Sequence, residues 1–215
     1  MLIVPDTLKI ARFCNDIIIL DLLLDEYTVL ENAADSFLLH HEIDPVIEDF
    51  LISDKRCQYL KPVSQETPEA FLEIRWMKPS ADSQYSNIFS RMSAFMTLLI
   101  CKRKLRRSGM MAVRHEFPNA GISGSRTSIT SQVMTEITQE IASLNSVFDF
   151  ISHENPCLIY SCTLRHRLRT RKIDAKVVIG VRTRPFFSHA WVEVDKTIIS
   201  DDPGLREKAS VILEY

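Results

Sequence analysis

The second half of the chain contains two kinds of apolar spacing, and one follows the other. From residue 87 to about residue 107, and again from residue 128 to residue 150, apolar side chains recur every three or four positions. This spacing predicts two amphipathic helices. We expect the first helix to pack on the rest of its domain through its periodic apolar positions, which are Ile88, Met92, Phe95, Met96 and Leu99.

Two segments nearer the C-terminus are rich in valine and isoleucine instead. Residues 175–181 and 189–194 predict strands, and Arg184-Pro185 between them predicts the turn that joins them. A third, short strand is expected at 196–200, before a turn over 201–204. Because helices come first and strands follow, the sequence predicts an α+β fold.

A cysteine stands where another helix is expected to begin. Pro156 is a residue type favoured at the first helical position, so Cys157 lies near the N-terminal end of that helix. A thiol with an ordinary pKa of about 8.5 is mostly protonated at neutral pH and is a poor nucleophile. A helix N-terminus and a nearby imidazolium both lower that pKa, and His189 on the following strand could supply the second. Asp201 could then accept a hydrogen bond from the other imidazole nitrogen.

Each of these three residues also has an ordinary structural interpretation. Cys157 could be a small buried residue, and His189 a hydrogen-bonded strand histidine. Asp201 or its neighbour Asp202 could simply form the turn before Pro203. Only their combination in this order along the chain favours catalysis.

The N-terminal part predicts a separate small module. Residues 16–30 consist of an apolar run, a polar break at Asp25-Glu26 and a second run rich in tyrosine, threonine and valine, which predicts a β-hairpin. Helices are expected after Asn32 and from Asp44 to about residue 52, which together suggest a winged-helix-like fold. The polar stretch 78–84 suits a linker, so we predict domains at 1–80 and 81–215.

Composition and charge exclude several classes of protein. The chain has 46% hydrophobic and 25% charged residues with a net charge of −2, which predicts a globular protein without general attraction to nucleic acid or membranes. No apolar run reaches the roughly 20 residues of a membrane span. Five scattered cysteines and no secretory signal indicate the cytoplasm. His40, His41, Cys57 and His153 show no spacing typical of a zinc site, so we expect no metal.

The sequence around the cysteine and the histidine closely resembles the lasso-peptide leader peptidases of the microcin type, which are transglutaminase-like cysteine peptidases. The resemblance is carried by Cys157-Leu158, Tyr160-Ser161, the segments 178–183 and 188–194, and Pro185-Phe186. It implies a transglutaminase/papain-like C-terminal domain. It also implies that Cys157 is the nucleophile, His189 the general base and acid, and Asp201 the orienting carboxylate. Residues 151–156 contain no glutamine of the kind that papain-like enzymes use to stabilise the oxyanion.

A weaker resemblance links the N-terminal module to the leader-recognition element of such pathways. Ile19-Leu20-Asp21 and the run 27–30 match its hairpin pattern. In that family the leader docks as an added strand beside the hairpin, through main-chain hydrogen bonds and side-chain pockets. The resemblance makes Tyr27 and Val29 candidates for leader binding, and the alternative is that both side chains fill the core of the module.

The resemblance implies a function in a two-enzyme pathway. The peptidase would remove the leader of a precursor peptide, and the freed core amine would then be used by an ATP-dependent cyclase similar to asparagine synthetases. This chain has no Gly-rich phosphate loop, so we expect ATP to belong to that cyclase and no cofactor here. Basic residues at 102–107 could be a solvated helix end, touch nucleic acid or contact the cyclase.

Two rival functions stay open at this point. The same three residues could transfer the acyl group to an amine rather than to water, as in a transglutaminase-like acyltransferase. Alternatively, the N-terminal module could bind DNA, with a second domain that is not catalytic. The net charge and the lack of basic residues in the expected helices between residues 33 and 52 weigh against that regulator.

Overall fold

The computed structural model describes residues 7–34, 78–81, 86–115, 125–151 and 154–215. The chain divides into two compact units. The first comprises Met1–Leu72 with Gly180–Ser188 and Arg206–Leu213, and the second comprises Glu73–Ile179 with His189–Leu205 and Glu214–Tyr215. Several C-terminal strands therefore run through both units. The division into a recognition module at 1–80 and a peptidase domain at 81–215 stays a prediction.

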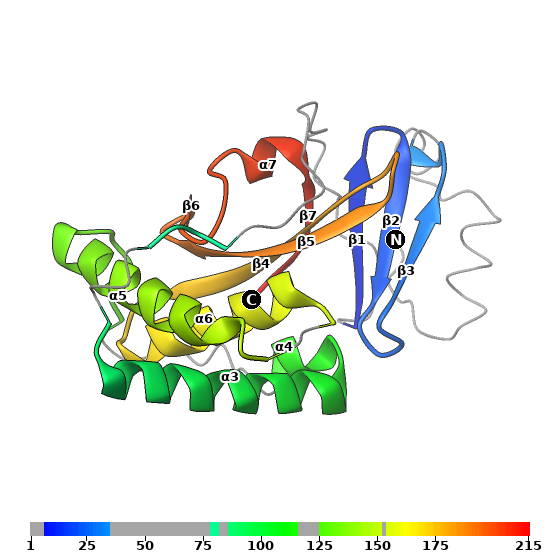
Figure 1. Ribbon diagram of the computed structural model, residues 1–215. Coiled ribbons are helices and arrows are strands. Elements are labelled where there is room, and N and C mark those ends of the chain that lie inside the picture. Colours follow the sequence, from blue (N-terminus) through cyan, green and yellow to red (C-terminus); the bar gives the residue numbers. More distant parts are fainter. Residues whose placement is uncertain (1–6, 35–77, 82–85, 116–124, 152–153) are drawn as a thin grey trace. The chain divides into compact units, whose positions relative to one another are not determined.

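The described part of the first unit begins with three antiparallel strands. These are β1 (Leu8–Phe13), β2 (Asp16–Asp21) and β3 (Glu26–Leu30), in the order β1-β2-β3 (Figure 1). Ile17 pairs with Leu30 and Asp21 with Glu26, so the hairpin predicted over 16–30 is confirmed. The turn contains Asp25 with a φ of 59°, a conformation that aspartate tolerates better than most residues. Strand β1 was not predicted.

A buried carboxylate holds this sheet to the turn between the two long C-terminal strands. Asp16 is fully buried, and it accepts hydrogen bonds from the Asn32 backbone N–H at 2.9 Å, from Thr183 Oγ1 at 2.6 Å and from Arg184 Nη2 at 3.1 Å. Burial raises the pKa of this carboxyl, but the hydrogen bonds from Thr183 and Asn32 and the charge of Arg184 outweigh burial and lower it. The aromatic rings of Tyr27 and Phe186 lie 5.2 Å apart in the same unit.

The winged-helix prediction depends on helices that the structure does not describe. The helices expected after Asn32 and from Asp44 to about residue 52 fall within residues 35–77, which lie outside the described residues. The winged-helix character of the module therefore stays a prediction.

The second unit contains four described helices. They are α3 (Ile88–Ser108), α4 (Met111–His115), α5 (Ser131–Phe148) and α6 (Pro156–Thr170). Asn87 caps α3 by accepting from the Ser90 N–H at 2.8 Å, and Thr130 caps α5 by accepting from the Val133 N–H at 3.3 Å. The helices predicted near 87–107, 128–150 and from Pro156 are confirmed. Helix α4 was not predicted.

The C-terminal strands form a four-stranded sheet with the order β6-β5-β4-β7. Its strands are β4 (Ala175–Arg182), β5 (Phe187–Val194), β6 (Thr197–Ile198) and β7 (Ser210–Glu214), and the short helix α7 (Leu205–Lys208) precedes β7. The two strands and the third short strand predicted after residue 174 are confirmed, whereas α7 and β7 were not predicted. Helices followed by a sheet make this an α+β protein, as predicted (Figure 1).

The core of the second unit lies between its helices and the sheet. Side chains of α3, α5 and α6 meet residues at the start of β4 and the end of β5 in one buried cluster. Its members are Ala94, Leu98, Val133, Ile137, Ile141, Leu144, Val147, Phe148, Ile159, Tyr160, Leu164, Leu168, Ile173, Ala175, Val192 and Val194. Burial of this apolar surface holds α6, which carries Cys157, against β5, which carries His189.

Helix α3 packs through a different face from the one its sequence predicts. Its buried residues are Ala94, Leu98 and Cys101. Of the five positions expected to pack inward, only Phe95 is partly buried against the core, and the other four are exposed. The prediction was wrong because it assumed that the larger apolar residues face the core. The small side chains of Ala94 and Cys101 allow close approach to the neighbouring helices instead.

A buried ion-pair network ties α5, α6 and α3 together. The Glu140 carboxylate on α5 is 2% exposed and accepts hydrogen bonds from Nε of Arg167 and Nε of Arg171. The Arg167 guanidinium also reaches α3, with Nη1 3.1 Å from Ser93 Oγ. Because the Arg167 guanidinium is buried together with the Glu140 carboxylate, loss of the carboxylate leaves that buried positive charge uncompensated.

We therefore expect Glu140→Gln to lower the free energy of unfolding by about 3–5 kcal/mol, since removing one partner of a buried ion pair costs that much. Urea unfolding followed by circular dichroism measures the change. The matched control is Glu136→Gln on the same helix, where the carboxylate pairs with the more exposed Arg126. There the expected loss is about 1 kcal/mol or less. Equal losses in the two variants would contradict the role given to Glu140.

Candidate active site

Cys157 occupies the second position of α6, as the sequence predicts. Pro156 begins the helix, and the Cys157 side chain is partly accessible. The backbone N–H of Leu158 at this first turn and that of Ala190 on β5 both donate toward its sulfur. A thiolate at this position is stabilised by the helix N-terminus and by two oriented N–H donors.

The helix and the strand are joined one turn further along. Ser161 Oγ donates a hydrogen bond of 3.1 Å to the carbonyl of Ala190, and both residues are buried. Ala190 directly follows His189, and its backbone contacts α6 twice, at Cys157 through the N–H and at Ser161 through the carbonyl. This double contact sets the position of β5 relative to Cys157.

His189 and Asp201 are in direct contact. Asp201 Oδ2 lies 2.7 Å from His189 Nε2, which leaves Nδ1 for the thiol of Cys157. His189 is buried, and its ring stacks on that of Trp191 with centroids 6.2 Å apart. The structure thus brings together the three residues that the sequence singled out.

The choice between the two adjacent acids is visible in the geometry. Asp201 faces the imidazole, whereas Asp202 Oδ1 accepts from the Gly204 N–H at 2.9 Å and so forms the turn. Just before them, Ser200 Oγ accepts from the Val192 N–H at 2.7 Å, which anchors the segment to β5. Asp201 is therefore held opposite His189 by the pairing of its neighbour with the strand.

The contacts polarise the cysteine and the histidine toward an ion pair. Burial acts against the ion pair because it raises the pKa of the Cys157 thiol. The hydrogen bond and charge of His189 and the two backbone N–H groups outweigh burial, so the pKa of this thiol is lowered. Burial likewise lowers the pKa of His189, but hydrogen bonds with Asp201 and Cys157 raise it to about 9. A thiolate beside an imidazolium is the form of a cysteine that attacks carbonyl carbon at neutral pH.

In two other cysteines of the second unit the pKa of the thiol is raised instead of lowered. Burial raises the pKa of Cys101 to about 11, and it also raises that of Cys162. Cys101 and Cys162 are buried in the helical core, while Cys157 is partly accessible. A buried thiol with a raised pKa is inert, so the electrostatics select Cys157 among these three.

Two further residues support the histidine from the same strand. Trp191 is fully buried and donates from Nε1 to Glu193 Oε1 at 2.7 Å. This bond fixes the indole on which the imidazole stacks. No sequence pattern pointed to a role in the site for Trp191, Glu193, Ser161 or Ala190, because their contacts depend on how β5 packs against α6 and on contacts within β5.

The candidate leader-binding residues lie in the first unit. Tyr27 and Val29 are half-buried on β3, an outer strand of the described three-stranded sheet. Because successive side chains of a strand alternate, both point to the same face. An outer strand can accept a further strand along its free edge, and half-burial leaves each side chain part of its surface for contact.

Neither a metal site nor a membrane span is found in the described parts of the chain. No group of three or more histidine, cysteine, aspartate or glutamate side chains there could hold a metal ion. His40, His41, Cys57 and His153 lie outside the described residues. Within the same ranges, no helix has both the length and the apolar character needed to cross a bilayer.

Comparison with known proteins agrees with this geometry. The profile of the transglutaminase-like superfamily matches residues 95–214, which include Cys157, His189 and Asp201. The chain is 31% identical over 216 aligned residues to the microcin J25-processing protein McjB of Escherichia coli, and the alignment covers 94% of this chain and 99% of that protein. No solved structure matches the chain significantly. The profile spans more than half of the chain and the alignment almost all of it, so this protein belongs to the transglutaminase-like superfamily and to the family of the microcin J25-processing protein.

Proposed function

We propose that this protein is a cysteine peptidase that removes the leader from a lasso-peptide precursor. The observation that carries the proposal is the polarised pair at the start of α6, where Cys157 meets an imidazole that Asp201 holds by a 2.7 Å contact. The similarity to a microcin-processing protein supports a ribosomal precursor peptide as the substrate. In this role Cys157 is the nucleophile, His189 the general base and acid, and Asp201 the orienting carboxylate.

The reaction runs as acyl transfer through a thioester. The Cys157 thiolate attacks the carbonyl carbon at the end of the leader, and the Cys157 backbone N–H at the helix start is one donor to the oxyanion. The carbon–nitrogen bond breaks, and the core peptide leaves as an amine that takes its proton from His189. Water then attacks the thioester while His189 accepts its proton, which releases the leader as a carboxylate and regenerates the thiol.

The products define the partners of the protein. The core peptide leaves with a free N-terminal amine, which an asparagine-synthetase-like cyclase joins to an acidic side chain of the core with the use of ATP. The peptidase step itself needs no cofactor, because the thiolate–imidazolium pair supplies both nucleophile and acid. A protein that acts on a newly made precursor alongside an ATP-dependent cyclase works in the cytoplasm.

The leader is recognised in this proposal by the first unit. A leader strand adds to β3, where main-chain hydrogen bonds hold it and the side chains of Tyr27 and Val29 contact it. Recognition away from the scissile bond lets one peptidase cut a precursor whose core has a variable sequence.

We expect Cys157→Ala to reduce leader removal by at least about a thousandfold, because the covalent intermediate cannot form. Mass spectrometry of the precursor after incubation with the protein, the cyclase and ATP measures the released leader. Cys162→Ala on the same helix is the matched control and should cut normally. Cutting by Cys157→Ala at the wild-type rate would refute the proposed nucleophile. A leader released as an amide of an added amine, rather than as the free acid, would favour the acyltransferase instead.

The pH dependence of cutting should be bell-shaped. Activity rises as the Cys157 thiol loses its proton, which occurs below the ordinary thiol range because the pKa is lowered. It falls as the pH passes about 9, where His189 loses the proton that the leaving amine needs. Asp201→Asn removes a contact that raises the His189 pKa, so we expect the alkaline limb to move to lower pH. An unchanged alkaline limb in Asp201→Asn would show that the limb reports another group.

Leader affinity should depend on one face of β3. We expect Tyr27→Ala to weaken binding of a fluorescently labelled leader peptide by about tenfold, the loss typical of a buried aromatic contact. Thr28→Ala on the opposite face should change binding by less than about twofold, and Tyr27→Phe should preserve the packing on Phe186. Fluorescence anisotropy gives the dissociation constants. Equal affinities for Tyr27→Ala and the wild type would place the leader elsewhere.

A further inference from the structure

Helix α3 presents a continuous face of large apolar side chains to solvent. Ile88, Phe89, Met92, Met96, Leu99 and Ile100 are all exposed, with Phe89 at 79% and Met92 at 63% of their surface. The opposite face of the helix, with Ala94, Leu98 and Cys101, is buried in the core of the second unit. Contiguous exposed apolar patches of several hundred Å² are rare on monomeric proteins and mark contact sites.

The same face changes from apolar to cationic along the helix axis. Positions 88, 92, 96, 99 and 103 are three or four residues apart, so Arg103 continues the stripe that begins at Ile88. Five of the six residues from 102 to 107 are lysine or arginine, and α3 contains no acidic residue. Arg103, Arg106 and Arg107 are exposed and form no ion pair within the parts of the chain that the structure describes.

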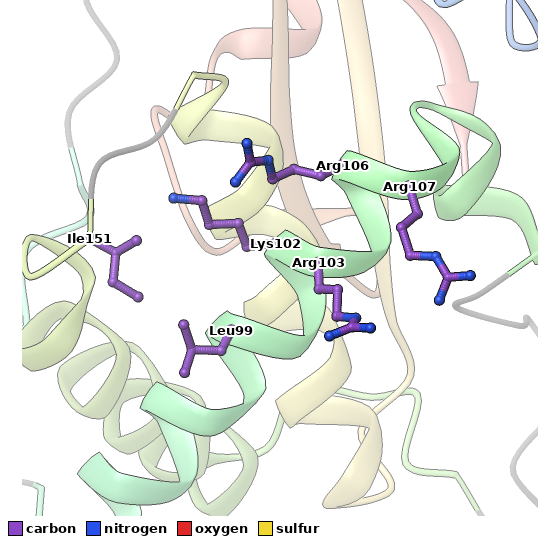
Figure 2. Close-up of a pocket in the computed structure, with 6 residues that line it drawn as sticks. All are labelled: Leu99, Lys102, Arg103, Arg106, Arg107 and Ile151. Atoms are coloured by element: carbon purple, nitrogen blue, oxygen red, sulfur yellow. The ribbon is translucent and has the colours of Figure 1, made fainter.

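The junction between the two halves of this face is hollow. A pocket of about 540 Å³ is lined by Leu99 and Ile151 together with Lys102, Arg103, Arg106 and Arg107. Figure 2 shows Leu99 and Ile151 at one side of the hollow, with the four basic side chains spreading from two successive turns of α3. A pocket with an apolar side and a cationic side fits a peptide segment in which apolar residues are followed by carboxylates.

Stabilisation of the helix end does not account for this arrangement. Basic residues favour a helix C-terminus only within its last turn, where Arg106 and Arg107 lie. Arg103 stands before that turn, in the middle of the exposed stripe and beside the apolar wall of the pocket. The apolar residues of the stripe gain nothing from the helix dipole.

The direction of the polarity change favours a protein partner over a membrane. A helix that lies in a bilayer surface carries its cations on the opposite or flanking faces along its whole length. On the exposed stripe of α3, Arg103 continues the line of Met92, Met96 and Leu99, so a membrane that buried Met92 and Met96 would also bury Arg103. The two methionines are flexible side chains that adapt to protein surfaces.

We propose that the exposed face of α3 is the docking surface for a partner protein that presents apolar side chains beside an acidic patch. We identify that partner as the cyclase that uses the freed core amine, and this identification rests on the proposed function. The surface lies close in sequence to the nucleophile, because Ile151 of the pocket comes six residues before Cys157.

The test measures binding of the purified cyclase to the full-length protein by biolayer interferometry. We expect the double variant Arg103→Glu/Arg106→Glu to weaken binding by about tenfold or more, as for reversal of charges that face a complementary patch. Met92→Ser/Met96→Ser should weaken it similarly, and added salt should weaken the wild-type complex. The matched control Lys172→Glu/Lys176→Glu reverses two exposed charges of the same unit and should bind within about twofold of wild type.

Separate readouts keep this inference distinct from the proposed function. The rate of Cys157 alkylation by iodoacetamide and cutting of the precursor without cyclase should be unchanged in the α3 variants. Wild-type protein that binds the cyclase but cuts no precursor would overturn the peptidase proposal alone. Cyclase binding equal in all variants, or absent in wild type, would overturn the docking surface. The docking surface would also be overturned if the α3 variants bound the cyclase as wild type does. The same holds if they instead lost binding to phosphatidylglycerol vesicles, to duplex DNA or to a second copy of the chain.

Discussion

The backbone of Ala190 is the contact on which the geometry of the site depends. Its N–H points to the sulfur of Cys157, and its carbonyl accepts the hydroxyl of Ser161 one helical turn later. A strand and a helix joined at two points of a single peptide backbone have little freedom to slide. His189, the preceding residue, is therefore placed beside the thiol by main-chain geometry, before any attraction between the two side chains is considered.

Charge at the site is stabilised against a cost that burial imposes. Desolvation disfavours both the thiolate of Cys157 and the imidazolium of His189, and it would leave each group neutral if it acted alone. The pair becomes ionic because each charge has specific partners, which are the two backbone N–H groups for sulfur and Asp201 for the imidazole. Cys101 and Cys162 lie in the same unit, but there burial is the largest effect and outweighs the neighbouring groups that favour the thiolate, so their pKa values are raised. Nucleophilicity here is a property of the local arrangement and not of cysteine as such.

Helix α3 shows where apolar spacing misleads. A period of three to four residues correctly predicts that 88–108 is helical, because only a helix places such residues on one face. The same spacing says nothing about which face meets the core. Here Ala94 and Cys101 lie against α5 and α6, where helices approach closely and Arg167 of α6 reaches Ser93. The larger apolar residues are left outside, which is why the packing prediction failed and why the helix has a surface for a partner.

The sequence by itself determined the three long helices and the strands β4, β5 and β6 in the second half of the chain, and the β2–β3 hairpin, because these depend on local spacing, capping and turn chemistry. It also singled out Cys157, His189 and Asp201 as candidate site residues. It named Asp201 without any contact that separates it from Asp202, and it missed β1, β7 and the contacts of Ser161 and Ala190. Those features require segments far apart in the chain to meet. Only tertiary packing decides such contacts, since a hydrogen bond between Ser161 and Ala190 has no signature in the residues around either one.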